Sequence, residues 1–418
     1  MTPSRRTLFQ AVGAGALIAA SAPEVLAADT SAQPPAQGLP APPAPSTAPA
    51  APQPEPPGFG EASKANNPVN IVSPEHLEAA ARKMVSPGRF AITGWCGEGL
   101  TYRANRASLD QTAISPRRLQ HVSQDAIDLH TSILGHKLPF PMITCPMGGH
   151  GSFHVDAEVA TAGGTGAAGT LYVSSGASTR PMEDIAKATP GPKWFQIYMN
   201  RDMELNRWLV QRAKAAGFSA IVLTADALGP GQSDEYIALG RPRDPNLTVG
   251  NHDPRYGGHG NFADMKWDLS FSDIGFLHEA SGGLPVITKG VVETEDIREA
   301  LKSGAAAIWV SNHGGRQMDG GPGSFTMLRS AVDTVEGRVP IIFDSGVRRG
   351  VDVFKAVAMG ATVCAVGRPV LWSLMCGGAP GVKSLYEWMA GELHSTMLLS
   401  GVAKVTDLKR RNLFLAKA

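Results

Sequence analysis

Short β-rich runs alternate with amphipathic stretches from about residue 70 to the C-terminus, and this alternation limits the fold more than any other feature of the chain. It is typical of strand–helix units around a parallel sheet. The runs with strand character cover residues 141–145, 169–174, 194–198, 220–224, 285–288, 307–310, 340–343 and 362–366. Helical patterns lie between them, for example at 203–216, 294–303 and 351–359. Eight such units predict an α/β fold, a (β/α)8 TIM barrel.

Two segments depart from this repeat. Residues 70–137 precede the first strand, and we expect them to form an N-terminal helical extension that plugs or flanks the barrel. The stretch 227–284 separates strand 4 from strand 5 and is rich in glycine and proline. Loops of this length in a compact domain are usually lids, binding loops or disordered segments. We therefore expect a long loop after strand 4.

The N-terminus has the pattern of a targeting region. Ser4-Arg5-Arg6-Thr7-Leu8-Phe9 is a twin-arginine pattern, and the apolar run after it is too short to span a membrane comfortably. We interpret residues 1–28 as a twin-arginine export signal that directs the protein to a bacterial periplasm; an uncleaved membrane anchor is the alternative. Residues 29–66 are expected to form a disordered Pro/Ala-rich linker, because 11 of the 29 residues from Thr30 to Gly58 are proline. Residues 67–418 remain for the barrel domain.

Composition excludes some classes of function. The formal net charge is +1, which gives no reason to expect nucleic acid as a partner. The four cysteines lie far apart and form no C-x-x-C pair, so neither a disulfide framework nor a zinc site is expected. We predict no metal site.

Polar residues and glycines follow the strands at the end where such barrels carry their chemistry. In chain order they are Met147 and Gly148, Ser175, Gln196 and Tyr198, Thr224 and Asp226, Lys289, Ser311 with His313 and Arg316, Asp344 with Gly346 and Arg348, and Gly367 with Arg368. One such residue is weak support, since a lone histidine is more often a core residue and Asp226 is also placed to cap a helix. A buried arginine, however, needs an anion. The set as a whole predicts an active site.

The last two of these turns each combine glycine with arginine. Barrels commonly bind phosphate after strands seven and eight, through backbone N–H groups and a helix N-terminus. The alternative is an ordinary glycine turn with a surface arginine.

The residues quoted above resemble the FMN-dependent α-hydroxy-acid oxidase and dehydrogenase family, and most closely its L-lactate oxidase branch. The most specific portions are Trp194-Phe195-Gln196-Ile197-Tyr198 and the stretches 308–317 and 343–350. The resemblance runs from about Ile71 to the C-terminus. It implies FMN as the cofactor and a 2-hydroxy acid as the small-molecule substrate, oxidised to the 2-oxo acid.

The resemblance also implies roles for matching residues. His313 would take the substrate proton as a hydride passes to flavin N5, and Asp226 would stabilise the imidazolium that results. Arg316 would hold the substrate carboxylate, and Tyr198 would hydrogen-bond near the substrate oxygen. Lys289 would stabilise the negative charge that develops on the flavin. The remaining members would bind the cofactor: Met147, Gly148, Ser175, Gln196, Thr224 and Ser311 around the ring system, and Asp344, Gly346, Arg348, Gly367 and Arg368 along the ribityl phosphate.

Two expected substrate contacts are missing. A tyrosine of the family falls at Ala91 or Ile92, and a second arginine falls at Ser233. Gly148 stands where oxidases of the family frequently have alanine, which leaves oxygen, a cytochrome or a quinone open as electron acceptor.

Three hypotheses follow from these residues. The first is an exported FMN enzyme that oxidises a lactate-like 2-hydroxy acid. The second keeps the flavin chemistry with a larger hydroxy or amino substrate. The third is a flavin-loaded accessory protein without turnover. The family is often tetrameric, so the resemblance implies a homo-oligomer.

Overall fold

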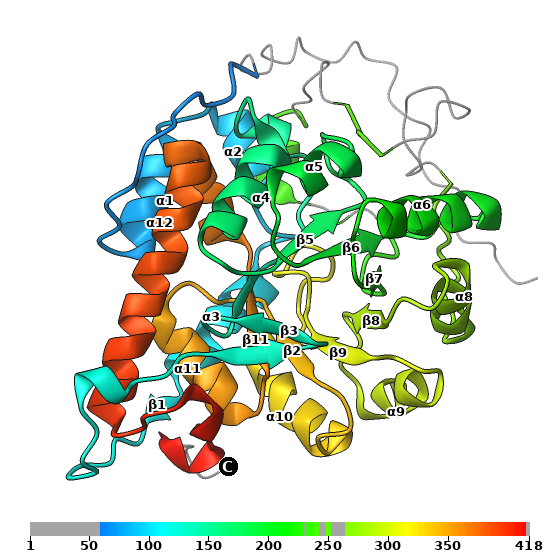
Figure 1. Ribbon diagram of the computed structural model, residues 1–418. Coiled ribbons are helices and arrows are strands. Elements are labelled where there is room, and N and C mark those ends of the chain that lie inside the picture. Colours follow the sequence, from blue (N-terminus) through cyan, green and yellow to red (C-terminus); the bar gives the residue numbers. More distant parts are fainter. Residues whose placement is uncertain (1–58, 230, 232, 242–247, 252–263, 415–418) are drawn as a thin grey trace, which may run out of the picture. The chain divides into compact units, whose positions relative to one another are not determined.

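Eight parallel strands close into a barrel in the computed structural model, which describes residues 59–229, 231, 233–241, 248–251 and 264–414 (Figure 1). Each strand pairs with the next one along the chain, and the last pairs with the first. The strands are β4 (Met142–Thr144), β5 (Tyr172–Ser175), β6 (Lys193–Ile197), β7 (Ile221–Thr224), β8 (Val286–Lys289), β9 (Ala307–Val310), β10 (Ile341–Phe343) and β11 (Val363–Val366). All eight predicted strands are present, so the (β/α)8 barrel is confirmed.

A helix follows each barrel strand and lies outside the barrel (Figure 1). In chain order these helices are α4 (Ala157–Ala167), α5 (Met182–Ala188), α6 (Met203–Ala215), α8 (Ser272–Ala280), α9 (Thr294–Lys302), α10 (Ser324–Val335), α11 (Gly350–Met359) and α12 (Arg368–Ser400). Their ends follow local rules. Asp202, for instance, caps α6 by accepting hydrogen bonds from the backbone N–H groups of Glu204 and Leu205.

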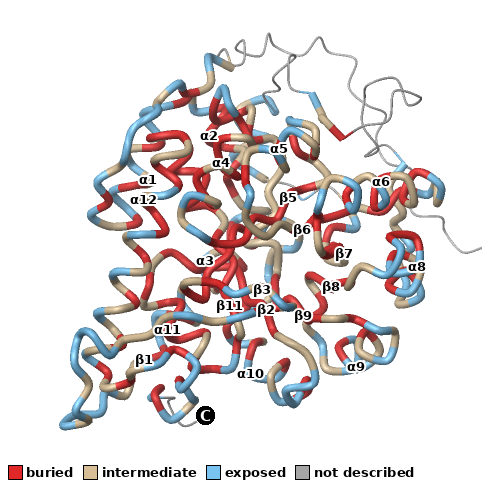
Figure 2. Tube along the Cα trace, viewed as in Figure 1, coloured by how far each residue is buried: buried red, intermediate tan, exposed pale blue. Residues whose placement is uncertain are grey.

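The inside of the barrel is a buried apolar layer beneath a polar one. The apolar side chains that pack together inside are those of Ile143, Val173, Trp194, Val222, Ile287, Trp309, Ile342 and Ala365. Side chains alternate along a strand, so the residue two positions later faces the same way. These next residues are Cys145, Ser175, Gln196, Thr224, Lys289, Ser311, Asp344 and Gly367. The pleat of the strands therefore turns these residues inward at the carboxyl end of the core. The barrel strands themselves are buried (Figure 2).

The amino end of the barrel is plugged by a hairpin and not by a helix. Strands β2 (Thr131–Ile133) and β3 (His136–Leu138) pair antiparallel, and Ile133 and Leu138 pack into the interior cluster. The predicted extension does contain helices, α1 (Pro74–Arg82), α2 (Pro87–Ala91) and α3 (Leu100–Asp110), and α1 packs against α12 (Figure 1). A further strand pair joins β1 (Ala113–Ile114) to β12 (Leu413–Phe414). Strands this short carry no readable sequence period, which is why the prediction missed them.

The predicted linker boundary at residue 67 is too late. The Phe59 carbonyl accepts hydrogen bonds from Arg89 and Ser86, and the Arg89 guanidinium lies 4.3 Å from the centre of the Phe59 ring. Ser63 is buried and forms a β-bridge with His154. Aromatic and polar contacts thus fix residues 59–66 on the domain, where composition suggested only a linker. The predicted export signal, residues 1–28, and the rest of the predicted linker lie outside the described residues.

The predicted long loop region after strand 4 is confirmed. Strand β7 ends at Thr224 and β8 begins at Val286, with α7 (Asp234–Ala238) and α8 between them. Short 3-10 helices occur at Gln124–Ala126, His150–Ser152, Val405–Asp407 and Arg410–Asn412.

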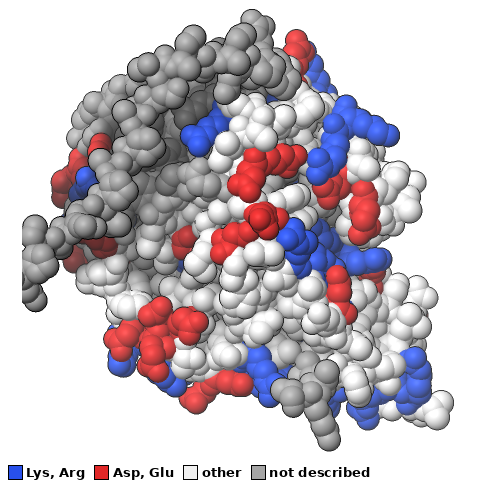
Figure 3. Space-filling model, turned by 180° about the vertical axis from the view of Figure 1, so that it is seen from behind, with Lys and Arg blue, Asp and Glu red and all other residues white. Residues whose placement is uncertain are grey.

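On the face drawn in Figure 3, basic and acidic side chains are interspersed. In the described ranges, no helix combines the length and the apolar character that crossing a membrane requires.

Candidate active site

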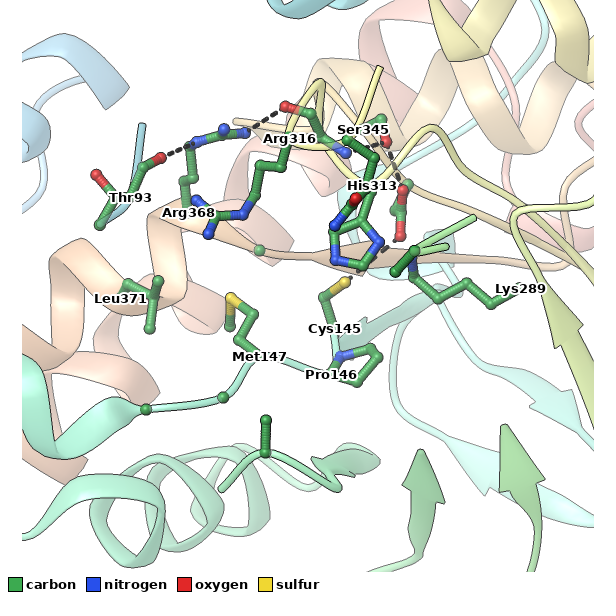
Figure 4. A pocket seen from close by; sticks show the side chains of 18 of the residues that line it. Thr93, Cys145, Pro146, Met147, Lys289, His313, Arg316, Ser345, Arg368 and Leu371 are labelled. Carbon is green, nitrogen blue, oxygen red and sulfur yellow. Dashed lines mark hydrogen bonds between the residues drawn. The ribbon is translucent and has the colours of Figure 1, made fainter. Parts of the chain in front are cut away.

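A cavity of about 680 Å³ opens at the carboxyl end of the barrel. In Figure 4, Arg368 and Thr93 lie at one end of the pocket and Lys289 at the other, and His313 faces the turn of Cys145, Pro146 and Met147. The predicted site residues that line the cavity are Met147, Gly148, Tyr198, Lys289, His313, Arg316, Asp344, Gly346, Arg348, Gly367 and Arg368. The structure therefore brings predicted residues from six strand ends into one cavity.

A histidine, a carboxylate and a lysine form the centre of this site. His313 Nδ1 lies 2.9 Å from Asp226 Oδ1, and Lys289 Nζ lies 3.6 Å from Asp226 Oδ2. Lys289 also donates to Ser311 Oγ at 3.0 Å, and the same hydroxyl accepts the backbone N–H of His313. Asp226 therefore orients the imidazole through Nδ1, which leaves Nε2 as the nitrogen available to a substrate.

The backbone of the turn is strained in a way that supports this geometry. His313 has a φ of 58°, in the left-handed region that side chains other than glycine rarely adopt. Gly314 and Gly315 continue in the same region, with φ values of 68° and 70°. Gly290 is a second required glycine, because a Cβ there would lie 2.4 Å from Asp226 Cγ. Strain of this kind is characteristic of functional sites.

Burial and neighbouring charge set the protonation of the three groups. Burial lowers the pKa of His313, and the Lys289 ammonium lowers it further. Burial alone would raise the pKa of Asp226, but Lys289 and His313 together bring it below its ordinary value. Burial likewise opposes the charge on Lys289, and the carboxylates of Asp226 and Asp344 nevertheless raise its pKa. The site thus holds a neutral imidazole beside a permanent ion pair.

Arg316 and Tyr198 border the same cavity. Arg316 donates from Nη1 to the backbone carbonyls of Ile92 and Gly94, at 2.6 and 3.1 Å. Arg316 is exposed, but desolvation by the atoms around it lowers its pKa. Burial raises the pKa of Tyr198 to about 12. Tyr198 is therefore a neutral phenol, able to donate a hydrogen bond.

Two further arginines extend the positive end of the cavity. Arg348 and Arg368 are 7% and 9% exposed. Burial lowers the pKa of Arg368 to about 9, and Arg348 and Arg316 contribute to that shift. Within the described ranges, Arg316, Arg348 and Arg368 form no ion pair with a carboxylate. Arg316 is exposed at the cavity, whereas Arg348 and Arg368 are buried. Two buried cations without a carboxylate partner call for an anionic ligand.

The remaining predicted cofactor residues do not line the cavity; they form the polar layer at its floor. Ser175 Oγ donates to Gln196 Oε1 at 2.9 Å. Thr224 and Ser311 are buried in the same layer. The amide nitrogen of Gln196 is buried without a partner among the described residues.

These features fit FMN, the cofactor that the sequence resemblance implies. The buried pair Arg348 and Arg368 suits a phosphate, and the unpaired Gln196 amide suits a carbonyl of the ring system. No group of three or more histidine, cysteine or acidic side chains in the described ranges is arranged to hold a metal ion.

Cys145 lines the cavity and was not predicted. Its thiol donates to Asp344 Oδ2, which also accepts the indole N–H of Trp309 at 2.9 Å. Burial raises the pKa of Cys145, with Asp344 contributing, so the thiol stays protonated. Strand alternation was the available signal, because Cys145 lies two residues after the inward-facing Ile143.

The structure locates the positions where expected substrate contacts are missing. Ile92 lines the cavity with an apolar side chain, while Ala91 is buried in α2. Ser233 caps α7 by accepting the backbone N–H of Tyr236, and it forms a β-bridge with Gly97. Neither segment supplies a phenol or a guanidinium to the cavity.

Gly148 has a packing role. A Cβ at this position would lie 2.6 Å from Ala177 Cβ and 2.7 Å from its carbonyl oxygen. The close approach of the two turns therefore accounts for a glycine here without reference to the electron acceptor.

Comparisons with known proteins agree with this geometry. The family model described as FMN-dependent dehydrogenase matches residues 80–415. An L-lactate oxidase of Lentilactobacillus hilgardii is 37% identical over 356 residues, which cover 82% of this chain and 95% of the relative. A crystal structure described as a lactate oxidase of Pediococcus acidilactici superposes with a TM-score of 0.81 at 36% identity, covering 86% of this chain and 99% of the other. A mandelate oxidase structure gives a TM-score of 0.76 at 33% identity, covering 82% and 98%.

Proposed function

The chain belongs to the family of FMN-dependent dehydrogenases, and we propose that it oxidises a 2-hydroxy acid to the 2-oxo acid with His313 as the base. The observation that carries the proposal is the contact of His313 Nδ1 with Asp226 beside the buried Lys289. A catalytically idle flavin carrier would have no use for this arrangement.

The positions of the residues support a role for each in this reaction. FMN, when bound, accepts the hydrogen and electron pair removed from the substrate α-carbon. His313 Nε2 takes the hydroxyl proton, because Nδ1 is engaged by Asp226. Asp226 then stabilises the imidazolium electrostatically. Arg316 holds the substrate carboxylate, and the Tyr198 phenol donates to a substrate oxygen.

The protonation of His313 predicts how activity depends on pH. Burial and Lys289 lower its pKa, so the ring is a neutral base at pH 7. We expect kcat/KM to be level near neutrality and to fall only below about pH 6.5, as the free enzyme's imidazole becomes protonated. Initial rates in buffers of constant ionic strength check this. An acid limb centred above pH 7 would contradict the assignment.

The residues on the substrate side of the cavity favour a larger 2-hydroxy acid as the second candidate substrate. Each missing hydrogen bond to the carboxylate removes about 1.5–3 kcal/mol of binding free energy. Val249, Met265 and Trp267 border the cavity together with Ile92, and they offer apolar contacts instead. Relatives act on substrates of both sizes by name, lactate and mandelate.

The proposal also covers the electron acceptor, the location and the oligomeric state of the enzyme. The oxidase relatives support oxygen as the electron acceptor, and a cytochrome or quinone remains the alternative. The twin-arginine pattern at Arg5-Arg6 supports export to the periplasm as a folded, cofactor-loaded protein. We also propose a homotetramer, on the resemblance alone.

The decisive experiment is anaerobic reduction of the purified yellow protein. We expect at least one acid among glycolate, lactate, 3-phenyllactate and mandelate to bleach the flavin absorbance, and the rates to rank the substrates. Bleaching by none of a broad panel of 2-hydroxy acids would disprove the proposed function. Bleaching by amino or hydroxy compounds without a carboxylate would keep the flavin chemistry but replace the 2-hydroxy acid with another substrate class.

A further inference from the structure

The buried arginines of the cavity lie against aromatic rings. The guanidinium carbon of Arg368 is 4.9 Å from the centre of the Tyr102 ring. That of Arg348 is 5.3 Å from the Trp372 ring and 6.0 Å from Tyr102. The Trp95 ring stacks on Tyr102, with centroids 4.6 Å apart and an interplanar angle of 20°. Three aromatic side chains thus surround two cations.

The rest of the hydrogen bonding of these arginines goes to neutral backbone carbonyls. Arg368 donates to Thr93, Gly94 and Gly314, at 2.6, 2.6 and 2.9 Å. Arg348 donates to its neighbour Val347 at 3.0 Å. A carboxylate would hold them more strongly, but it would also cancel the positive potential that attracts an anion. A ring face attracts a cation through its quadrupole and carries no net charge. The rings and carbonyls therefore position both arginines without a counter-charge.

The aromatic rings are themselves fixed by the turn that carries the base. A Cβ on Gly315 would lie 2.7 Å from the Tyr102 backbone nitrogen, and one on Gly99 would lie 2.6 Å from the Trp95 ring. Asp319 accepts the backbone N–H groups of Gly99 and Thr101 at the start of α3. The catalytic turn, α3 and the two stacked rings accordingly pack as one unit.

We propose that Tyr102, supported by Trp95 and joined by Trp372, is a positioning residue that holds Arg348 and Arg368 for the phosphate of FMN without neutralising them. The inference rests on the proposed placement of the FMN phosphate at these arginines. These aromatic side chains lie away from the reacting atoms. They would contribute to retention of the cofactor and to the preference for FMN over riboflavin.

The test compares two flavins that differ only in the phosphate. Full-length protein loaded with FMN or riboflavin is diluted stepwise, and the fluorescence of released flavin gives each Kd. For Tyr102→Leu we expect the Kd of FMN to rise about tenfold, which corresponds to about 1.4 kcal/mol, while the Kd of riboflavin changes less than about twofold. Tyr102→Phe keeps the ring and is expected to retain wild-type affinity for both flavins.

Two further variants keep the test informative if Tyr102→Leu does not fold. Trp95→Leu removes the stacked ring. We expect it to raise the Kd of FMN by a smaller factor than Tyr102→Leu does, and to leave the Kd of riboflavin unchanged. Trp208→Leu is the matched control, since the Arg212 guanidinium lies 4.3 Å from that ring on α6, and it should change neither Kd. Equal weakening of both flavins, or no change, in Tyr102→Leu and Trp95→Leu would overturn the inference. A wild-type protein with no preference for FMN would instead refute the phosphate site itself.

Discussion

Replacing His313 with glutamine is expected to lower kcat by about a hundredfold to ten-thousandfold, the range that positioned acid–base groups contribute. Glutamine keeps a polar side chain of similar length but cannot accept the substrate proton. Asp226 and Lys289 remain paired in this variant, so the cavity stays formed. The measurement is the rate of anaerobic flavin reduction by the best substrate of the panel.

Flavin content and thermal stability should be nearly unchanged in His313→Gln, because the proposed cofactor contacts lie on other residues. His130→Gln is the matched control: His130 also pairs with an aspartate, Asp128 at 2.7 Å, but it is 76% exposed and outside the cavity. We expect full activity from it. If His313→Gln retained wild-type rates, His313 would not be the base.

Much of the site was predictable because strand alternation is rigid. Once Trp194 and Ile287 are recognised as inward-facing, Gln196 and Lys289 must face the same way at the carboxyl end. The eight strands were predicted from the alternation of β-rich and amphipathic runs, and eleven of the residues that line the cavity from their places at the strand ends. The same rule places Cys145 in the polar layer, but cysteine carries no expectation of a role there and was passed over.

Other features depend on contacts between segments distant in the sequence. Nothing in the short runs that contain Ile133 and Leu138 indicates that they plug the barrel. The stack of Trp95 on Tyr102 requires knowing how the turn before α3 folds back. Phe59 falls within the predicted linker, and only its contact with Arg89 places it on the domain. Sequence patterns report the period of an element, and tertiary packing decides its neighbours.

Replacing Lys289 with methionine is the second change expected to have a large effect. The side chain is 3% exposed and its ammonium is the cation that faces buried Asp226. Loss of a preorganised charge at a reacting centre typically lowers the rate by about 10²–10³-fold. Breaking a buried ion pair also costs about 3–5 kcal/mol of unfolding free energy. Stopped-flow flavin reduction and chemical denaturation measure the two effects separately.

In the same variant we expect a change in the pKa of His313 that an unspecific loss of structure would not produce. Lys289 lowers the pKa of His313, whereas Asp226 raises it. Without the ammonium the carboxylate acts unopposed, so the acid limb of kcat/KM should move to higher pH. Lys302→Met, which removes an exposed lysine paired with Glu299 on α9, should leave rate, stability and pH profile as they are. A slower Lys289→Met enzyme with an unmoved acid limb would mean that Lys289 acts on the flavin alone, and that the charge balance around Asp226 does not set the basicity of His313.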